Sequence, residues 1–116
     1  MGVEEVRRLL DRFQEKVVAR LFSAQEAAWC ERGKPSRAVC YAACLATKEA
    51  FTKALSGRLP LSAWPQLELI PSERGWRLTL DEPILRSVPE AQEFDFQVSW
   101  SEAQGVVVAI VIGWPR

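Results

Sequence analysis

Two charged side chains, Glu49 and Lys53, stand four residues apart within residues 46–55. In a helix, residues with this spacing are neighbours on one face, so a carboxylate lies beside an ammonium group. A carboxylate can bind a hard metal ion and a lysine can bind phosphate, but surface pairs of this kind are also common as simple ion pairs. The pair alone therefore leaves a chemical role and a purely structural role open.

The chain contains no histidine. This excludes every nucleophile that depends on a neighbouring imidazole and every metal site that needs imidazole ligands. A general base would have to be a carboxylate, a lysine, a tyrosine or water. A bound metal would be a hard ion with oxygen ligands.

The overall composition is that of one globular domain, which we expect to span residues 1–116. The chain is 48% hydrophobic and 26% charged, and its 15 basic residues balance 15 acidic ones. Zero net charge argues against a general nucleic-acid-binding protein. The N-terminal sequence lacks the apolar core of a signal peptide, and the longest apolar run, residues 106–112, is too short to span a membrane. We therefore expect a cytoplasmic protein with no nucleic-acid or membrane partner.

The three cysteines are Cys30, Cys40 and Cys44, an odd number without a C-x-x-C pair. Cys40 and Cys44 lie one helical turn apart in an alanine-rich stretch. We interpret all three as buried free thiols, because free cysteine behaves as a small hydrophobic residue. Free thiols are typical of a reducing cytoplasm.

The first half of the sequence predicts three helices. Apolar residues recur at spacings of three and four over residues 3–22, which indicates an amphipathic helix. The segment Ser23-Ala24-Gln25-Glu26 fits a capping box at the start of a second, short helix, which ends near residues 33–35. A third helix is expected from Ser36 to about residue 56, where Gly57 stops it.

The second half of the sequence predicts strands, because apolar and polar residues alternate there with a period of two. We expect two hairpins linked by a short helix, in the order strand 67–69, turn 71–75, strand 76–80, helix 81–88, strand 94–100 and strand 106–112. The last strand is apolar on both faces, so we expect it to be central in the sheet or covered. The predicted fold class is α+β, with an antiparallel sheet and helices on one face.

The helix that carries Glu49 resembles the K-E-A-x-x-K-A signature of the 4′-phosphopantetheinyl transferases, and most closely that of the small holo-acyl carrier protein synthases. Four further segments are similar to family segments in the same order, namely residues 21–26, 56–59, 67–75 and 98–112. The ordered set covers nearly the whole chain and is more specific than any one of its motifs. The resemblance implies the family's fold, an antiparallel sheet packed against a long helix.

The resemblance also implies an activity, the transfer of phosphopantetheine from coenzyme A to a serine of an acyl carrier protein, with Mg²⁺ on the coenzyme A pyrophosphate. Glu49 matches the family's metal ligand, and Lys53 matches a catalytic lysine that contacts phosphate or assists proton transfer. The positions implied for coenzyme A binding are Lys48, Gly75, Ser99 and Ser101, of which Lys48 either touches phosphate or positions the helix. Small members of the family are trimers with active sites between subunits, so the resemblance implies a trimer here, and it also implies a role in fatty acid biosynthesis or a related pathway.

The sequence also departs from the family pattern. The family's G-x-D strand, which supplies a second metal-binding carboxylate, has no counterpart, since Met1 stands where the first helix starts; Glu4 or Glu5 could substitute. Cys44 stands at the place of a family arginine, and Glu102 at that of a family histidine. We therefore expect slow transfer or none from this chain. The alternative is a catalytically degenerate relative that keeps the fold and acts as a carrier-protein-binding or structural module.

A basic stripe runs along the predicted first helix. Its members are spaced by four residues each and are Arg8, Arg12, Lys16 and Arg20. Like charges at this spacing repel one another, so the stripe slightly destabilises the helix. The stripe is either a solvated polar face or a docking face for an acidic partner, and the resemblance implies docking of an acidic carrier protein.

Overall fold

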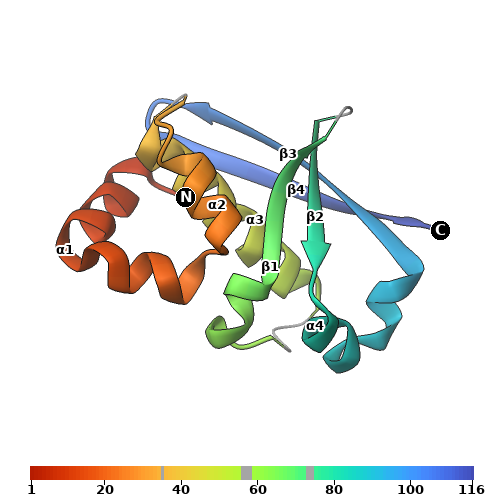
Figure 1. The fold of residues 1–116 in the computed structure, drawn as a ribbon. Helices are drawn as coiled ribbons and strands as arrows, with labels where there is room; N and C mark the ends of the chain where they lie inside the picture. Colours follow the sequence, from red (N-terminus) through yellow and green to blue (C-terminus); the bar gives the residue numbers. More distant parts are fainter. Residues whose placement is uncertain (35, 56–58, 73–74) are drawn as a thin grey trace.

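A four-stranded antiparallel sheet forms one layer of the protein, seen here in a computed structural model that describes residues 1–34, 36–55, 59–72 and 75–116 (Figure 1). The strands follow one another in sequence order and are β1 (Leu67–Ser72), β2 (Gly75–Leu80), β3 (Phe94–Ala103) and β4 (Val106–Pro115). The alternation in the sequence predicted both hairpins. Strand β1 continues to Ser72 and strand β2 begins at Gly75, so the connection between them is shorter than the predicted turn of residues 71–75.

Three helices form the second layer, namely α1 (Val3–Leu21), α2 (Ala24–Cys30) and α3 (Arg37–Ala54). Helix α3 contacts β1, β3 and β4, while α1 and α2 pack on α3 (Figure 1). Three of its alanines, Ala38, Ala42 and Ala43, are buried, which allows close approach of its neighbours. The arrangement confirms the predicted α+β class with helices on one face of the sheet.

Side-chain caps fix the starts of two of these helices. The Ser23 hydroxyl accepts a hydrogen bond from the Glu26 backbone amide, and the Glu26 carboxylate accepts one from the Ser23 amide, so the predicted capping box is present. Ser36 caps α3 by accepting from the Val39 amide at 3.1 Å. The predicted stop at Gly57 and the proline at position 35 lie outside the described residues.

Helix α1 has a break that the apolar spacing did not predict. Gln14 adopts φ 47° and ψ −129°, which is not helical and lies in a region that side-chain-bearing residues rarely occupy. Val6 and Leu10 are buried before the break, but Phe13 is 44% exposed. The three-four spacing continues through the break, so periodicity alone could not reveal it.

The two hairpins are joined by α4 (Glu82–Ser87) and the 3₁₀ helix η2 (Pro89–Glu93), and a second 3₁₀ helix, η1 (Leu61–Gln66), precedes β1. The helix after Asp81 was predicted, whereas neither 3₁₀ turn was. Among the described residues no helix combines the length and the apolarity that crossing a membrane requires.

Strand β4 lies at the edge of the sheet, so the prediction of a central strand is wrong. It pairs with β3 along its length, and among the residues that the structure describes its other edge pairs with the first residues of the chain. Its outward side chains are apolar and exposed by 46 to 58%; they are Val106, Val108, Ile110, Ile112 and Trp114. Val107, on the other face, is buried. The sequence showed two apolar faces, but the structure covers only one of them.

The prediction of three free thiols is wrong for two cysteines. Cys30 and Cys40 form a disulfide, with their Cα atoms 5.3 Å apart. Cys30 ends α2 and Cys40 lies in the first turn of α3, and the short connection between these helices brings the two side chains together. Cys44 is a buried free thiol, as predicted.

Candidate active site

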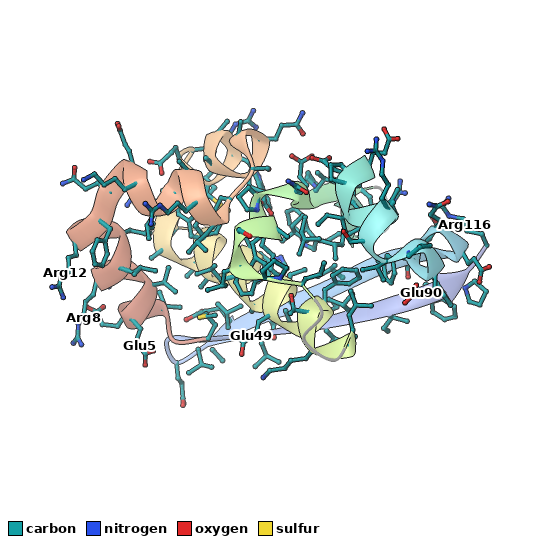
Figure 2. The ribbon with its side chains drawn as sticks, turned by 90° about the horizontal axis from the view of Figure 1, so that it is seen from below. Glu5, Arg8, Arg12, Glu49, Glu90 and Arg116 are labelled. Atoms are coloured by element: carbon teal, nitrogen blue, oxygen red, sulfur yellow. A yellow bond between two sulfur atoms is a disulfide. The ribbon has the colours of Figure 1, made fainter. Side chains whose placement is uncertain are left out.

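Glu49 and Lys53 lie on the solvent-facing side of α3, as their spacing predicted. The Lys53 Nζ is 3.2 Å from the Glu49 Oε1. The Lys53 side chain is 76% exposed and the Glu49 side chain is 47% exposed. Figure 2 labels Glu49 where α3 passes the long strands of the sheet. Both charges therefore remain accessible to a ligand.

A shallow hollow surrounds this pair. Its lining includes Met1, Glu49, Lys53 and residues 107–109 of β4. The Met1 ammonium group donates to the Val107 carbonyl at 2.9 Å, and the Val107 amide donates to the Met1 carbonyl at 2.8 Å. The hollow thus lies between α3 and β4, with the N-terminal residues paired to the strand beside it.

Among the described residues that line this hollow, Glu49 is the one carboxylate. Glu4 forms an ion pair with Arg7 at 2.6 Å, and neither Glu4 nor Glu5 is part of the lining. An accessible carboxylate in an open hollow can give oxygen ligands to a hard cation and leave the other positions to water and phosphate.

Lys48, next to Glu49 in sequence, is fully buried and points the other way. Its Nζ donates to the Glu26 Oε1 at 2.5 Å, to the Leu21 carbonyl at 2.7 Å and to the Trp64 carbonyl at 2.9 Å. A lysine ammonium has three N–H donors, so none remains for a phosphate. Of the two roles expected for Lys48, this geometry favours positioning of α3.

Glu26 is the centre of this buried network, and sequence reasoning recognised it only as a helix cap. Besides Lys48, its carboxylate accepts from the amides of Ser23 and Leu69, at 2.9 Å each. The carboxylate therefore joins α2, α3 and β1. Burial lowers the pKa of Lys48, and the adjacent Glu26 carboxylate opposes that shift.

The other expected coenzyme A contacts lie elsewhere in the chain. Ser99 and Ser101 are exposed on β3, directly opposite Ile110 and Val108 in the register, and so share the sheet face that α3 does not cover. Gly75 begins β2 with φ +109°. The structure does not bring these three residues into the hollow beside Glu49.

The basic stripe is exposed along its whole length, with the break at Gln14 between its two halves. Figure 2 shows Arg8 and Arg12 on the outer side of α1, directed away from the sheet. The Arg12 guanidinium lies over the exposed ring of Phe13, 5.3 Å from its centroid. An apolar side chain therefore stands within the positive surface.

At the junction of α2 and α3, Tyr41 is fully buried, and its hydroxyl donates to the Glu31 Oε2 at 2.6 Å. The Arg37 Nε also donates to Glu31, at 2.8 Å. Burial raises the pKa of Tyr41 well above its ordinary value, and the Glu31 carboxylate raises it further. The hydrogen bond from Tyr41 lowers the pKa of Glu31 in turn.

This environment predicts an unusual alkaline titration, and Tyr41 is the chain's single tyrosine. We expect no phenolate absorbance from the folded protein at about pH 11, whereas the chain unfolded in guanidinium should ionise at about pH 10. Because the folded pKa is the higher one, the hydrogen bond stabilises the fold at neutral pH and its contribution is lost as the pH rises above about 10. A folded-state midpoint near 10 would contradict a buried, carboxylate-bound phenol.

Three comparisons with known proteins cover almost the whole chain. The family model of the 4′-phosphopantetheinyl transferase superfamily matches residues 2–111. A holo-[acyl-carrier-protein] synthase of Hyphomonas neptunium is 35% identical, over 98% of this chain and 92% of that protein.

Solved structures agree with the fold. The holo-[acyl-carrier-protein] synthase of Neisseria meningitidis superposes with a TM-score of 0.83 at 18% identity, over 98% of this chain and 92% of that one. The Helicobacter pylori synthase, solved in complex with coenzyme A, gives 0.78 at 19% identity, over 98% and 95%. At these identities the likeness establishes the fold alone.

Proposed function

The chain belongs to the 4′-phosphopantetheinyl transferase superfamily, and from this premise we propose that it transfers 4′-phosphopantetheine from coenzyme A to a serine of an acyl carrier protein. The observation that carries the proposal is the accessible Glu49–Lys53 pair at the place of the family signature, within a chain 35% identical to a holo-acyl carrier protein synthase. The carrier serine hydroxyl attacks the phosphorus that bears the pantetheine, the pyrophosphate P–O bond breaks, and 3′,5′-ADP leaves.

Mg²⁺ fits the donors of the hollow. The ion binds proteins through one or two carboxylates, takes phosphate oxygens from the substrate and keeps several waters, and Glu49 offers one carboxylate beside open space. When bound, it would neutralise negative charge that develops on the leaving phosphate. Glu49 would hold the ion, while Lys53 would contact phosphate or assist proton transfer.

The direct test incubates an apo carrier protein with coenzyme A, Mg²⁺ and the chain, and follows the carrier by mass spectrometry. Because the described hollow offers one carboxylate, we expect a slow mass increase of one phosphopantetheine group that requires all components. Binding of the apo carrier protein without modification would instead support the alternative, a degenerate relative that keeps docking but not catalysis.

We propose further that the chain works as a trimer, as the family resemblance implies. The exposed apolar side chains of β4 support self-association, because an exposed stripe of this kind marks an interaction surface. Ser99 and Ser101 lie on the same sheet face, so contact between copies offers a way to bring them near a neighbour's Glu49.

We expect Ile110→Lys to convert the assembly to monomers, because a buried, unpaired ammonium at the interface is costly. Light scattering after size exclusion measures the mass of the assembly. Leu61→Lys is a matched control, since Leu61 is 61% exposed on η1, away from β4. An unchanged mass for Ile110→Lys would show that the β4 face is not the interface.

The partner of the basic stripe is, we propose, the acidic carrier protein. We expect Arg12→Glu with Lys16→Glu to slow association at low salt, because opposite charge mainly accelerates encounter. The remaining rate should depend less on salt. Stopped-flow binding to an apo carrier protein measures both effects.

A control for this experiment reverses the same amount of charge elsewhere. Arg86 and Arg116 are exposed on α4 and at the C-terminus, and among the described residues they pair with Glu82 and Asp95, respectively. Their double reversal to Glu should leave the association rate close to that of the unmodified chain. Equal rates for both double variants would mean that the stripe is only a solvated surface.

A further inference from the structure

All three cysteines of the chain converge at the junction of α2 and α3. Their sulfur atoms lie within 4.8 Å of one another, and all three side chains are buried. Cys30 and Cys40 are bridged across ten positions of sequence, whereas Cys44, one turn further along α3, is free. Burial raises the pKa of the Cys44 thiol, so it stays protonated and is a poor nucleophile towards the bridge.

The bridge anchors a helix that is too short to be stable alone. Helix α2 has seven residues, whereas isolated helices shorter than about 12 residues are marginal in water. Its N-terminal half is held by the capping box and by buried Glu26, and its last residue, Cys30, is held by the bridge to α3. Trp29 adds a ring contact to Trp76 on β2, at 4.4 Å between centroids.

The same helix carries the partner of Lys48. Glu26 lies one turn before Cys30, and its carboxylate binds Lys48, the residue directly before Glu49. Cleavage of the bridge frees the C-terminal end of α2, which weakens the constraint on Glu26. The segment of α3 that carries Lys48 and Glu49 is then less firmly positioned. The disulfide is therefore connected to the candidate site through α2 and the Glu26–Lys48 pair.

We propose that Cys30 and Cys40 are a reversible redox site, and that their reduction lowers the transfer rate by loosening α2 and the Glu26–Lys48 pair behind Glu49. In this step a dithiol reductant gives two electrons and two protons to the bridge. The sulfur–sulfur bond breaks, two thiols form, and the reductant becomes a disulfide. The activity readout rests on the proposed function, whereas the thiol and stability readouts below do not.

The experiment compares the full chain with and without dithiothreitol. Maleimide labelling of the denatured chain should count one thiol in the oxidised protein and three in the reduced protein. We expect reduction to lower the unfolding midpoint by roughly 10 °C, as loss of a short disulfide loop predicts. The transfer rate, measured well below both midpoints so that all molecules are folded, should fall several-fold.

Variants separate the bridge from the third thiol. Cys30→Ser should have the low midpoint and the low rate with or without the reductant, while Cys44→Ala should respond to reduction as the unmodified chain does. Three thiols in the air-oxidised protein would refute the bridge. If labelling counts three thiols after reduction and the transfer rate is unchanged, the coupling between the bridge and the candidate site is refuted. If the oxidised chain shows no transfer at all, the proposed function is refuted instead.

Discussion

Glu49→Gln is expected to reduce phosphopantetheine transfer by on the order of a hundredfold to a thousandfold, the usual cost of removing one group that stabilises transition-state charge. Glutamine keeps the size and the helix but loses the negative charge, and no second carboxylate lines the described hollow. Calorimetry should therefore also show that the variant loses Mg²⁺-dependent binding of coenzyme A. The rate is measured by the mass shift of an apo carrier protein.

A matched control exists in the same chain. Glu82 and Arg86 form another exposed pair at a spacing of four, 2.9 Å apart on α4. Glu82→Gln removes a comparable ion pair and should leave transfer unchanged, since exposed pairs contribute little to stability. If the two variants transferred at the same rate, Glu49 would be only a helix-surface residue.

Lys48→Met is expected to destabilise the fold by about 3–5 kcal/mol, because it leaves a buried carboxylate without its counter-charge. The Leu21 and Trp64 carbonyls lose their donor as well. This is a large share of the roughly 5–15 kcal/mol that typically stabilises a domain. Denaturant unfolding measures the loss.

Two further variants test the cause of that loss. Lys53→Met, five residues along the same helix, removes a 76% exposed ammonium and should change the unfolding free energy by less than about 1 kcal/mol. Adding Glu26→Gln to Lys48→Met should recover part of the stability, because the unpaired charge is gone. A double variant less stable than Lys48→Met alone would contradict a charge-based penalty.

Local patterns in the sequence predicted much of the fold. The alternation around Leu69 and Leu78 marked a hairpin, and Ser23 with Glu26 marked a helix start, since both signals depend on neighbours along the chain. The same local view placed Glu49 and Lys53 correctly on one exposed helix face, because that relation needs only four residues of helix.

The remaining features depend on contacts between distant segments. The pair of Glu26 with Lys48 joins residues 22 positions apart, and the sequence recorded only two separate motifs. The Cys30–Cys40 bridge depends on how α2 packs against α3, which places the two Cα atoms 5.3 Å apart. The edge position of β4 could not be predicted, because an apolar strand has the same sequence pattern at the centre of a sheet and at its edge.

The edge strand also has a consequence for the isolated chain. Residues 106–112 are seven consecutive apolar residues without charge or proline, and the side chains of one face are exposed on an edge that is open beyond Val107. Such a segment is a template for cross-β stacking between molecules. We therefore expect concentrated solutions of the isolated chain to form amyloid-like fibrils, and a charge within the run, as in Ile110→Lys, to suppress them.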